Sequence, residues 1–258
     1  MKKIMFISFA LIIAVMLLML SFILSSKDDT AKKTLVSSSL VSTLTSTMTS
    51  NAIATTTTEG VDSMPPSEID NLWAYYLVNE DNPLPSDFEI VTAEIYDDRE
   101  VDKRIAPYLI EMLAAAKADG IHLKVQSAYR SVAYQEMLYE MSIERFMEKD
   151  MTREEATAAT AKELAFPGTS EHNAGLAVDL NTRDSWELTE SFENTPEFKW
   201  LKVNSYKYGF ILRYPEDKVD ITGIIYEPWH YRFIGVHHAT KLTESGLCLE
   251  EYIEKFPK

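Results

Sequence analysis

The sequence predicts a mixed α+β fold, formed by one domain of about 190 residues that follows an apolar N-terminal segment and a Ser/Thr-rich segment. Segments with helical and with strand periodicity interleave along this domain, without the regular βαβ alternation of a doubly wound parallel sheet. In addition, 46% of the 258 residues are hydrophobic and 25% are charged. These ordinary values exclude a collagen-like, fibrous or wholly disordered chain.

The first element is an uncharged apolar run from Ile4 to Leu24, which follows Lys2 and Lys3. Its 21 residues exceed the roughly 7 to 15 of a cleaved signal sequence and match the about 20 that span a bilayer. The preceding lysines are expected to stay in the cytoplasm, which sends the rest of the chain across the membrane. Residues 1–26 are therefore predicted to form a single-pass signal anchor in the cell membrane. The protein is secreted if this segment is cleaved.

Serine and threonine dominate the next segment, residues 27–66, which has no aromatic residue up to Thr58. Such a segment buries too little apolar surface to offset its ordering entropy. We expect a disordered linker over residues 27–66 and a single extracytoplasmic domain over residues 67–258. The net charge of −15 has the wrong sign for nucleic-acid binding, and the single cysteine excludes an intramolecular disulfide.

The first half of the domain is predicted to contain three helices and one strand. Helical spacing of apolar residues indicates a helix over residues 104–119, closed by Gly120. Alternation over residues 121–126 then indicates a strand with one buried face. Ser131 can cap a helix that carries Met137 and Met141, and a capping box of Thr152 and Glu155 begins another that runs to about residue 164.

The second half of the domain is predicted to contain more strands. The compact apolar run at residues 175–180 is typical of a strand. Thr195 and Pro196 begin a helix, and Gly209 closes it. Residues 210–214 and 223–233 are strand-like, and two helices are predicted over residues 236–244 and 249–256.

Two of the five histidines, His172 and His230, lie in segments that suit a metal site. Asp179 lies inside an apolar run, where an unpaired carboxylate is costly to bury, so it needs either a Lys or Arg partner or a metal ion. Zinc favours imidazole nitrogen with carboxylate oxygen, and keeps one open position beside three protein ligands when it is catalytic. His172, Asp179 and His230 supply that set if the chain turns at Gly175.

Glu227 precedes His230 by three positions, and Pro228 restricts Glu227 to extended geometry. Its carboxylate is then expected near the metal. As a fourth ligand Glu227 closes the site and makes the metal structural, whereas just outside the coordination sphere it can take a proton from water. The sequence leaves both arrangements open.

The remaining candidates have ordinary explanations. His237 and His238 are adjacent on a predicted helix, about 100° apart, so both cannot easily bind one metal. His122 is expected to face solvent. Cys248 is expected to be a small core residue, and Trp229 to pack beside the metal loop.

The sequence resembles the VanY-type D-alanyl-D-alanine carboxypeptidases, zinc peptidases that act on peptidoglycan stem peptides. The resemblance depends on Ser-x-His-x-x-Gly-x-Ala-x-Asp at residues 170–179 and Glu-Pro-Trp-His at residues 227–230. It continues at residues 77–79, 82–85, 127–131, 209–214 and 249–252, in that order, and so covers residues 77–252.

The resemblance implies a set of site residues. His172, Asp179 and His230 bind one Zn²⁺ per chain, in a small antiparallel sheet with helices packed around it. Glu227 is the catalytic base, and Arg130 faces the scissile carbonyl. Ser127, Gln135 and Ser170 match positions that line the substrate pocket in related enzymes.

We therefore expect a zinc-dependent D-alanyl-D-alanine carboxypeptidase that removes the terminal D-Ala from peptidoglycan stem pentapeptides by attack of a metal-bound water. Serine-type chemistry is not expected. Two alternatives stay open: an L,D-carboxypeptidase acting on stem tetrapeptides, and a non-catalytic wall-binding module with a structural zinc. The expected partners are a stem peptide ending in D-Ala-D-Ala and, through the N-terminal helix, the membrane.

Overall fold

The computed structural model describes residues 72–96 and 98–257. The predicted anchor and linker, residues 1–66, and the predicted start of the domain lie outside the described residues. Within the described ranges, no helix is both long enough and apolar enough to cross a membrane.

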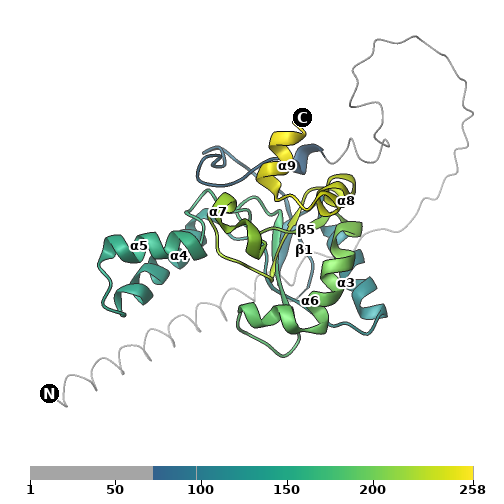
Figure 1. Ribbon diagram of the computed structural model, residues 1–258, viewed down its shortest axis with the longest axis horizontal. Coiled ribbons are helices and arrows are strands. Elements are labelled where there is room, and N and C mark those ends of the chain that lie inside the picture. Colours follow the sequence, from purple (N-terminus) through teal and green to yellow (C-terminus); the bar gives the residue numbers. More distant parts are fainter. Residues whose placement is uncertain (1–71, 97, 258) are drawn as a thin grey trace, which may run out of the picture. The chain divides into compact units, whose positions relative to one another are not determined.

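A four-stranded antiparallel sheet with the strand order β3-β4-β6-β5 forms the centre of the domain (Figure 1). Its strands are β3 (Leu123–Ser127), β4 (Ala177–Thr182), β5 (Phe210–Leu212) and β6 (His230–Phe233). The short strands β1 (Thr92–Glu94) and β2 (Glu100–Asp102) form a separate antiparallel pair. This arrangement confirms the predicted mixed α+β fold with a small antiparallel sheet.

The helices lie where the sequence predicts them, apart from the one-turn helix α7. They are α3 (Ala106–Ala118), α4 (Val132–Met147), α5 (Arg153–Glu163), α6 (Pro196–Asn204), α7 (Val219–Thr222), α8 (Val236–Ser245) and α9 (Leu249–Lys255). Short 3₁₀ helices are η1 (Leu72–Ala74), η2 (Glu190–Asn194), η3 (Ser205–Tyr208) and η4 (Glu216–Lys218). Both predicted caps are present, at Ser131 for α4 and as a Thr152 capping box for α5.

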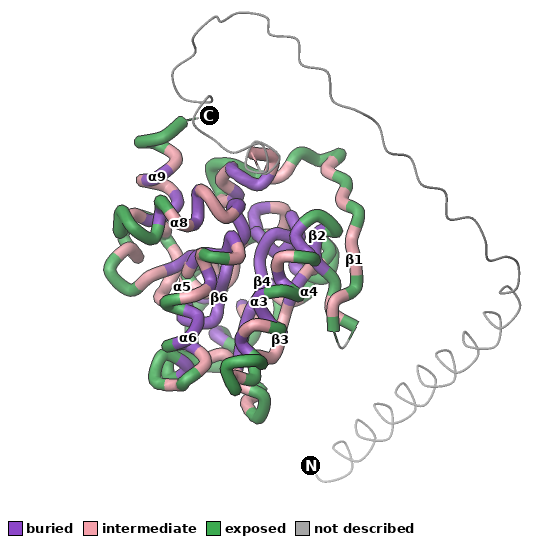
Figure 2. Tube along the Cα trace, turned by 90° about the vertical axis from the view of Figure 1, so that its right-hand side faces the viewer, coloured by how far each residue is buried: buried purple, intermediate pink, exposed green. Residues whose placement is uncertain are grey.

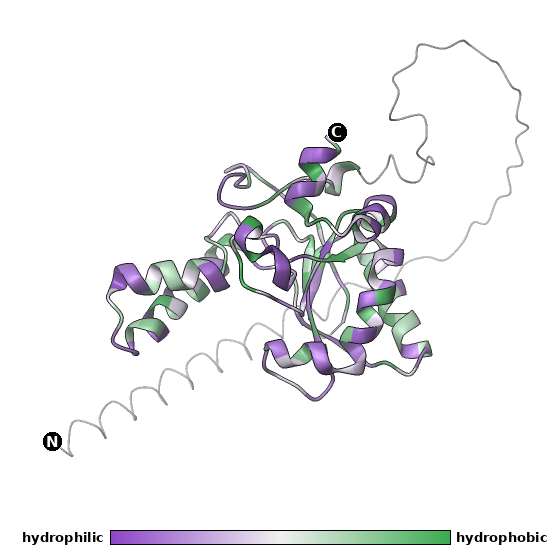
Figure 3. Cartoon of the chain, in the orientation of Figure 1, coloured by the Kyte–Doolittle hydropathy of each residue, from purple (hydrophilic) through white to green (hydrophobic). Residues whose placement is uncertain are grey.

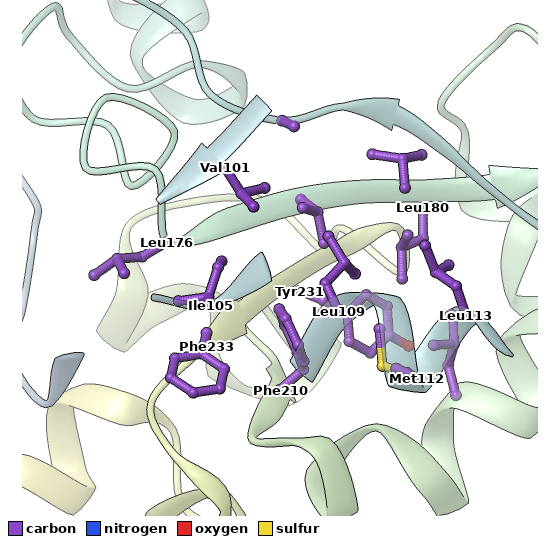
Figure 4. Close-up of a cluster of buried hydrophobic side chains, with 14 of the residues drawn as sticks. Val101, Ile105, Leu109, Met112, Leu113, Leu176, Leu180, Phe210, Tyr231 and Phe233 are labelled. Carbon is purple, nitrogen blue, oxygen red and sulfur yellow. The ribbon is translucent and has the colours of Figure 1, made fainter. Parts of the chain in front are cut away.

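One face of the sheet is apolar and carries the main core. Leu180 of β4 and Tyr231 of β6 pack there against α3, which contributes Leu109 and Met112 (Figure 4). Val125 of β3 belongs to the same core. Burying such side chains is the main favourable contribution to folding. Figure 2 shows β4 and β6 buried along their lengths. The opposite face carries polar residues, among them Asp179 and His230.

Helices α4 and α5 form a hairpin with a small core of its own. That core comprises Tyr139, Ile143, Phe146 and Ala156. Met137 and Met141, which the sequence places on α4, are 49% and 57% exposed. The buried side of α4 is the side that faces α5. The hydrophilic residues of α5 gather at its two ends (Figure 3).

The prediction of one strand over residues 223–233 is wrong for its first part, because only His230–Phe233 is a strand. Gly223 has φ 72° and ends α7, and Pro228 has no N–H to donate. The N–H groups of Ile225 and Glu227 donate to the carbonyls of Lys162 and Tyr214. The segment is therefore a loop that is hydrogen-bonded to α5 and to the residues after β5. The β1–β2 pair was not predicted.

Candidate active site

Neighbouring strands bring the first site residues together. Asp179 of β4 pairs directly with His230 of β6, so both side chains lie on the polar face of the sheet. On the other side of β4 the register of β3 shifts between Val125 and Ser127. This bulge makes Ser127 the partner of Asp179 and turns its side chain to the same face.

A glycine turn brings His172 to this face. Gly175 has φ 66°, and its N–H donates to the carbonyl of His172. A Cβ atom at this position would collide with the Ile90 side chain and lie 2.9 Å from the backbone nitrogen of Asp102. Only glycine suits both the backbone conformation and the space, which agrees with the predicted turn.

Three potential ligand atoms meet at Asp179. Its Oδ1 lies 3.3 Å from Nε2 of His172 and 3.1 Å from Nδ1 of His230. The ligand atoms of the three residues all lie within 4.8 Å of one another. Ligands in a tetrahedral zinc site, with bonds of about 2.0 to 2.2 Å, are separated by about 3.3 to 3.6 Å. The structure therefore brings the three predicted ligands to a spacing that suits zinc.

The hydrogen bonding of His172 tests whether a metal fits. Its Nδ1 lies 2.7 Å from the carbonyl oxygen of Ala128, so Nδ1 carries the proton and Nε2 presents a lone pair. Nε2 is buried and makes no hydrogen bond to any described residue. Burial lowers the pKa of His172 to about 4, so the imidazole stays neutral. A lone pair facing a carboxylate oxygen needs a cation between them, and a metal ion meets that need.

Asp179 uses its two oxygens differently. Oδ2 accepts a hydrogen bond from Nη2 of Arg130 at 2.7 Å, whereas Oδ1 faces the two imidazoles. Burial alone would raise the pKa of Asp179, but its histidine and arginine partners hold it well below the usual range. The sequence predicted either a basic residue or a metal ion as the partner of this carboxylate. The structure has room for both, because Arg130 binds Oδ2 and a metal ion fits at Oδ1.

Glu227 lies beside the three residues but outside their cluster. Its Oε2 is 3.6 Å from Nδ1 of His230, and the group with metal-binding geometry in the described part of the chain does not include it. Burial raises the pKa of Glu227 to about 8. A metal ion held by the other three residues would therefore keep a coordination position for water.

A cavity of about 160 Å³ opens at these residues. Its polar lining includes Arg130 and Glu227, and its apolar wall is formed by Leu188, Ile224 and Trp229. Ser170 also lines it. The cavity therefore joins the metal cluster, a buried carboxylate, a cation and an apolar wall.

Ser127 and Gln135 lie behind the cavity wall and contact Arg130. Nε of Arg130 donates to Ser127 Oγ at 2.9 Å, and Nη1 donates to Gln135 Oε1 at 3.3 Å. Gln135 is fully buried and donates in turn to the carbonyl of Ala165. Neither residue is part of the cavity lining, so their contacts orient the arginine.

Three further charged residues lie beside the site and were not predicted from the sequence: Glu171, Arg213 and Arg232. All three are buried, and Glu171 Oε2 lies 3.4 Å from Nε2 of His230. Burial opposes ionisation of Glu171, but the two arginines hold its pKa well below the usual range. A signal existed, because both arginines interrupt apolar strand segments as Asp179 does.

The other candidates behave as the sequence predicts. His237 and His238 lie on α8, outside the metal cluster found among the described residues. His122 is exposed, and Trp229 belongs to the main core. Cys248 is buried, and burial raises the pKa of its thiol to about 11.

Two imidazoles and a carboxylate around an open position, beside a buried glutamate, define the class of mononuclear metallohydrolases. The family model described as VanY, D-alanyl-D-alanine carboxypeptidase, matches residues 98–236. The chain belongs to this family and is thereby a zinc metallocarboxypeptidase.

Relatives and solved structures agree with this assignment. A D-alanyl-D-alanine carboxypeptidase of Enterococcus faecalis is 41% identical over 181 residues, which are 70% of this chain and 66% of the relative. A VanY variant from a VanB-type resistance cassette, solved with Zn(II), shares 41% identity and a TM-score of 0.64, covering 70% of this chain and 99% of that one.

Two more solved structures concern the substrate. VanYB in complex with D-alanine-D-alanine shares 40% identity and a TM-score of 0.66, covering 70% of this chain and 98% of that one. The LD-carboxypeptidase LdcB shares 37% identity and a TM-score of 0.59, and the match covers 70% of this chain and 86% of LdcB. Similar folds therefore serve both D,D- and L,D-carboxypeptidases.

Proposed function

We propose that this protein is a zinc-dependent D-alanyl-D-alanine carboxypeptidase that removes the terminal D-Ala from peptidoglycan stem pentapeptides. One observation carries the proposal: His172, Asp179 and His230 converge beside the buried Glu227 in a cavity that Arg130 also lines. The solved relatives with Zn(II) and with D-alanine-D-alanine support both the metal and the substrate class.

The zinc ligands in this proposal are Nε2 of His172, Oδ1 of Asp179 and Nδ1 of His230. The lack of a hydrogen-bond partner for Nε2 among the described residues and the spacing of the three atoms support this assignment. Zinc held by these three atoms would supply a water whose pKa is lowered towards about 7 and would polarise the carbonyl under attack.

Glu227 acts as general base and then as general acid. Its carboxylate takes a proton from the water that attacks the last peptide carbonyl and returns it to the departing D-Ala nitrogen as the C–N bond breaks. Glu227 is not part of the group in the described residues whose ligand atoms all lie within 4.8 Å of one another, which supports a place just outside the ligand set.

Arg130 stabilises the negative charge of the substrate. Three of its five N–H groups donate to Ser127, Gln135 and Asp179, and the other two are left for the terminal carboxylate and the carbonyl oxygen. A donor held in place before the reaction need not reorganise as charge develops.

The apolar wall suits a small side chain at the end of the substrate. Leu188, Ile224 and Trp229 line a cavity of only about 160 Å³, which favours the methyl group of alanine over a larger side chain.

Incubating the purified protein with a stem pentapeptide tests the proposal. We expect release of D-Ala, loss of that release with a chelator, and recovery with Zn²⁺. Glu227→Gln should keep its zinc while turnover falls by roughly 1000-fold or more. If no metal restores D-Ala release, the proposed activity is wrong. Loss of zinc from the Glu227→Gln variant would instead support a structural metal in a wall-binding module.

The similarity to LdcB favours one second candidate, an L,D-carboxypeptidase that acts on stem tetrapeptides. It uses the same metal and base but cleaves a bond one residue closer to the glycan. Matched pentapeptide and tetrapeptide substrates distinguish the two, because we expect kcat/KM to be higher for the pentapeptide. The opposite ranking would replace the D,D-activity by the L,D-activity.

We further propose that the chain is held in the cell membrane by residues 1–26, with the enzyme domain outside the cytoplasm. The uncharged run from Ile4 to Leu24 after two lysines supports this location. It places the active site in the compartment that contains the peptidoglycan substrate.

A further inference from the structure

A buried ion cluster lies directly behind His230. It consists of Glu171, Arg213 and Arg232, whose exposed fractions are 1%, 1% and 0%. Nε of Arg213 lies 2.7 Å and Nη1 of Arg232 lies 2.8 Å from the same oxygen, Oε1 of Glu171. Charges this deeply buried are costly unless they are paired, so the cluster calls for an explanation beyond packing.

The two oxygens of Glu171 have different partners. Oε1 accepts from both arginines, whereas Oε2 lies 3.4 Å from Nε2 of His230. The other ring nitrogen of His230, Nδ1, lies 3.1 Å from Asp179 Oδ1 on the metal side. His230 is thus held between one carboxylate at the proposed metal position and another behind it.

The two arginines of the cluster also contact segments near the start and near the end of the described residues. Nη2 of Arg232 donates to the carbonyls of Ala74 and Tyr76 in and after η1. Arg213 also binds the carboxylate of Glu250 on α9, through Nη1 and Nη2. These contacts hold the two arginines that bind Glu171.

We propose that Glu171 is a positioning residue for His230. It accepts the Nε2 proton, which fixes the ring orientation and the tautomer that presents the Nδ1 lone pair to the metal. Carboxylates that bind the second nitrogen of a metal-ligating histidine typically contribute about 10- to 100-fold to metal affinity. The inference rests on the proposed role of His230 as a zinc ligand.

Arg213 and Arg232 hold the Glu171 carboxylate in place in this arrangement. Two guanidinium groups on one oxygen balance the buried carboxylate, so it remains an acceptor with a fixed position. The second oxygen stays directed at His230. A cluster that only stabilised the fold would not require this contact with the imidazole.

Zinc affinity, measured by competition with a chromophoric chelator, tests the proposal on the full chain. Glu171→Gln should weaken zinc binding about 10- to 100-fold and change the visible absorption of the Co²⁺-substituted protein. Glu250→Gln is the matched control, because it takes a carboxylate from the same Arg213 without touching His230. We expect it to keep the parent zinc affinity and the parent Co²⁺ spectrum.

A second variant keeps the test decisive if Glu171→Gln fails to fold. The double variant Glu171→Gln with Arg213→Met removes one negative and one positive charge. The net charge of the buried cluster is then the same as in the parent. Its zinc affinity should remain about 10- to 100-fold below that of the parent. Parent-like affinity in a folded Glu171 variant overturns the proposal, and so does an equal loss in Glu250→Gln.

His230→Ala separates this inference from the proposed function. If His230→Ala binds zinc as tightly as the parent, His230 is not a ligand and the proposed site fails. If His230→Ala loses zinc while Glu171→Gln keeps it, only the positioning role of Glu171 is wrong.

Discussion

At the scale of single residues, Arg130 connects the cavity to the proposed metal ligand Asp179. It contacts Asp179 through Nη2, Ser127 through Nε and Gln135 through Nη1, and it also lines the cavity. A lysine can replace its charge but not its forked geometry. The geometry of Arg130 therefore depends on residues that do not reach the cavity themselves.

Arg130→Lys tests how much this geometry contributes. We expect kcat/KM for the stem pentapeptide to fall by about 100- to 1000-fold, as when a comparable oxyanion donor is removed, while bound zinc stays near one per chain. Arg104→Lys is the control, because Arg104 pairs with Asp102 and is not part of the cavity lining. Parent-like kcat/KM in Arg130→Lys would contradict a role that needs the guanidinium.

Glu227 leads to a prediction about the metal-free protein. Burial raises its pKa from 4.5 to about 8, so between these values the folded state holds a proton that the unfolded state has lost. The stability that this proton contributes is complete below the unfolded pKa and disappears as the pH rises through the folded pKa. An ionised Glu227 therefore destabilises the metal-free domain at alkaline pH.

Urea unfolding with chelator present measures this effect. Because Gln resembles the protonated acid, Glu227→Gln should be more stable than the parent at pH 8.5, by on the order of 1 to 3 kcal/mol, with a smaller difference at pH 5. Glu155→Gln, in the solvent-exposed capping box of α5, should show no such gain. A difference for Glu227→Gln that does not change with pH would refute this interpretation.

At the scale of elements, Gly175 and Gly223 offer a matched comparison. Both have positive φ, 66° and 72°, but only Gly175 is crowded, by Ile90 and the backbone of Asp102. Gly223→Ala should cost about 1 kcal/mol for the left-handed backbone alone. Gly175→Ala should cost roughly 3 kcal/mol or more, because it adds a collision in the turn that carries His172.

Denaturant unfolding measures the loss of folding free energy in each variant. Zinc affinity shows whether the turn still holds His172 in place. We expect Gly175→Ala to weaken zinc binding and Gly223→Ala to leave it unchanged, because only the first variant displaces His172. Equal costs for the two substitutions would show that the close contact at Gly175 is relieved without strain.

Local signals explain which elements could be predicted from the sequence. Ser131 and the Thr152 capping box mark helix starts through contacts within four residues, and both were predicted. The loop over residues 223–229 was not, because its N–H groups bind carbonyls on α5 and after β5 that are distant in sequence. Apolar composition alone does not distinguish such a loop from a strand.

In the candidate site, too, residues with a local sequence signal could be predicted, whereas residues placed by long-range contacts could not. His172, Asp179 and His230 could be proposed as a group because an acid in an apolar run needs a cation. Gln135 could not be placed behind Arg130, since its burial depends on how α4 meets the carbonyl of Ala165. Glu171 could not be connected to His230, because that contact exists only once β6 lies beside the metal loop.

At the scale of the whole molecule, the location of the enzyme depends on residues 1–26, which precede the described part of the chain. The run from Ile4 to Leu24 has 21 residues without a charge, about the length that spans a bilayer. Two lysines before the run favour an orientation with the N-terminus in the cytoplasm, as proposed above. A retained anchor keeps the domain within reach of new peptidoglycan at the membrane, whereas cleavage releases it.

Fractionation of cells that produce the full chain distinguishes these outcomes. We expect the protein to stay in the membrane pellet after an alkaline carbonate wash, with an intact mass that includes residues 1–26, because an apolar helix of this length does not leave the bilayer. Protease added to cells with permeabilised walls should digest the domain, because the proposed topology has the domain outside the cytoplasm. A variant with Leu11 and Leu17 changed to Lys is the control, and it should leave the pellet because two charges in the hydrocarbon core are costly. Recovery of the parent protein from the medium, with its N-terminus beyond Leu24, would contradict the anchor and indicate a cleaved signal.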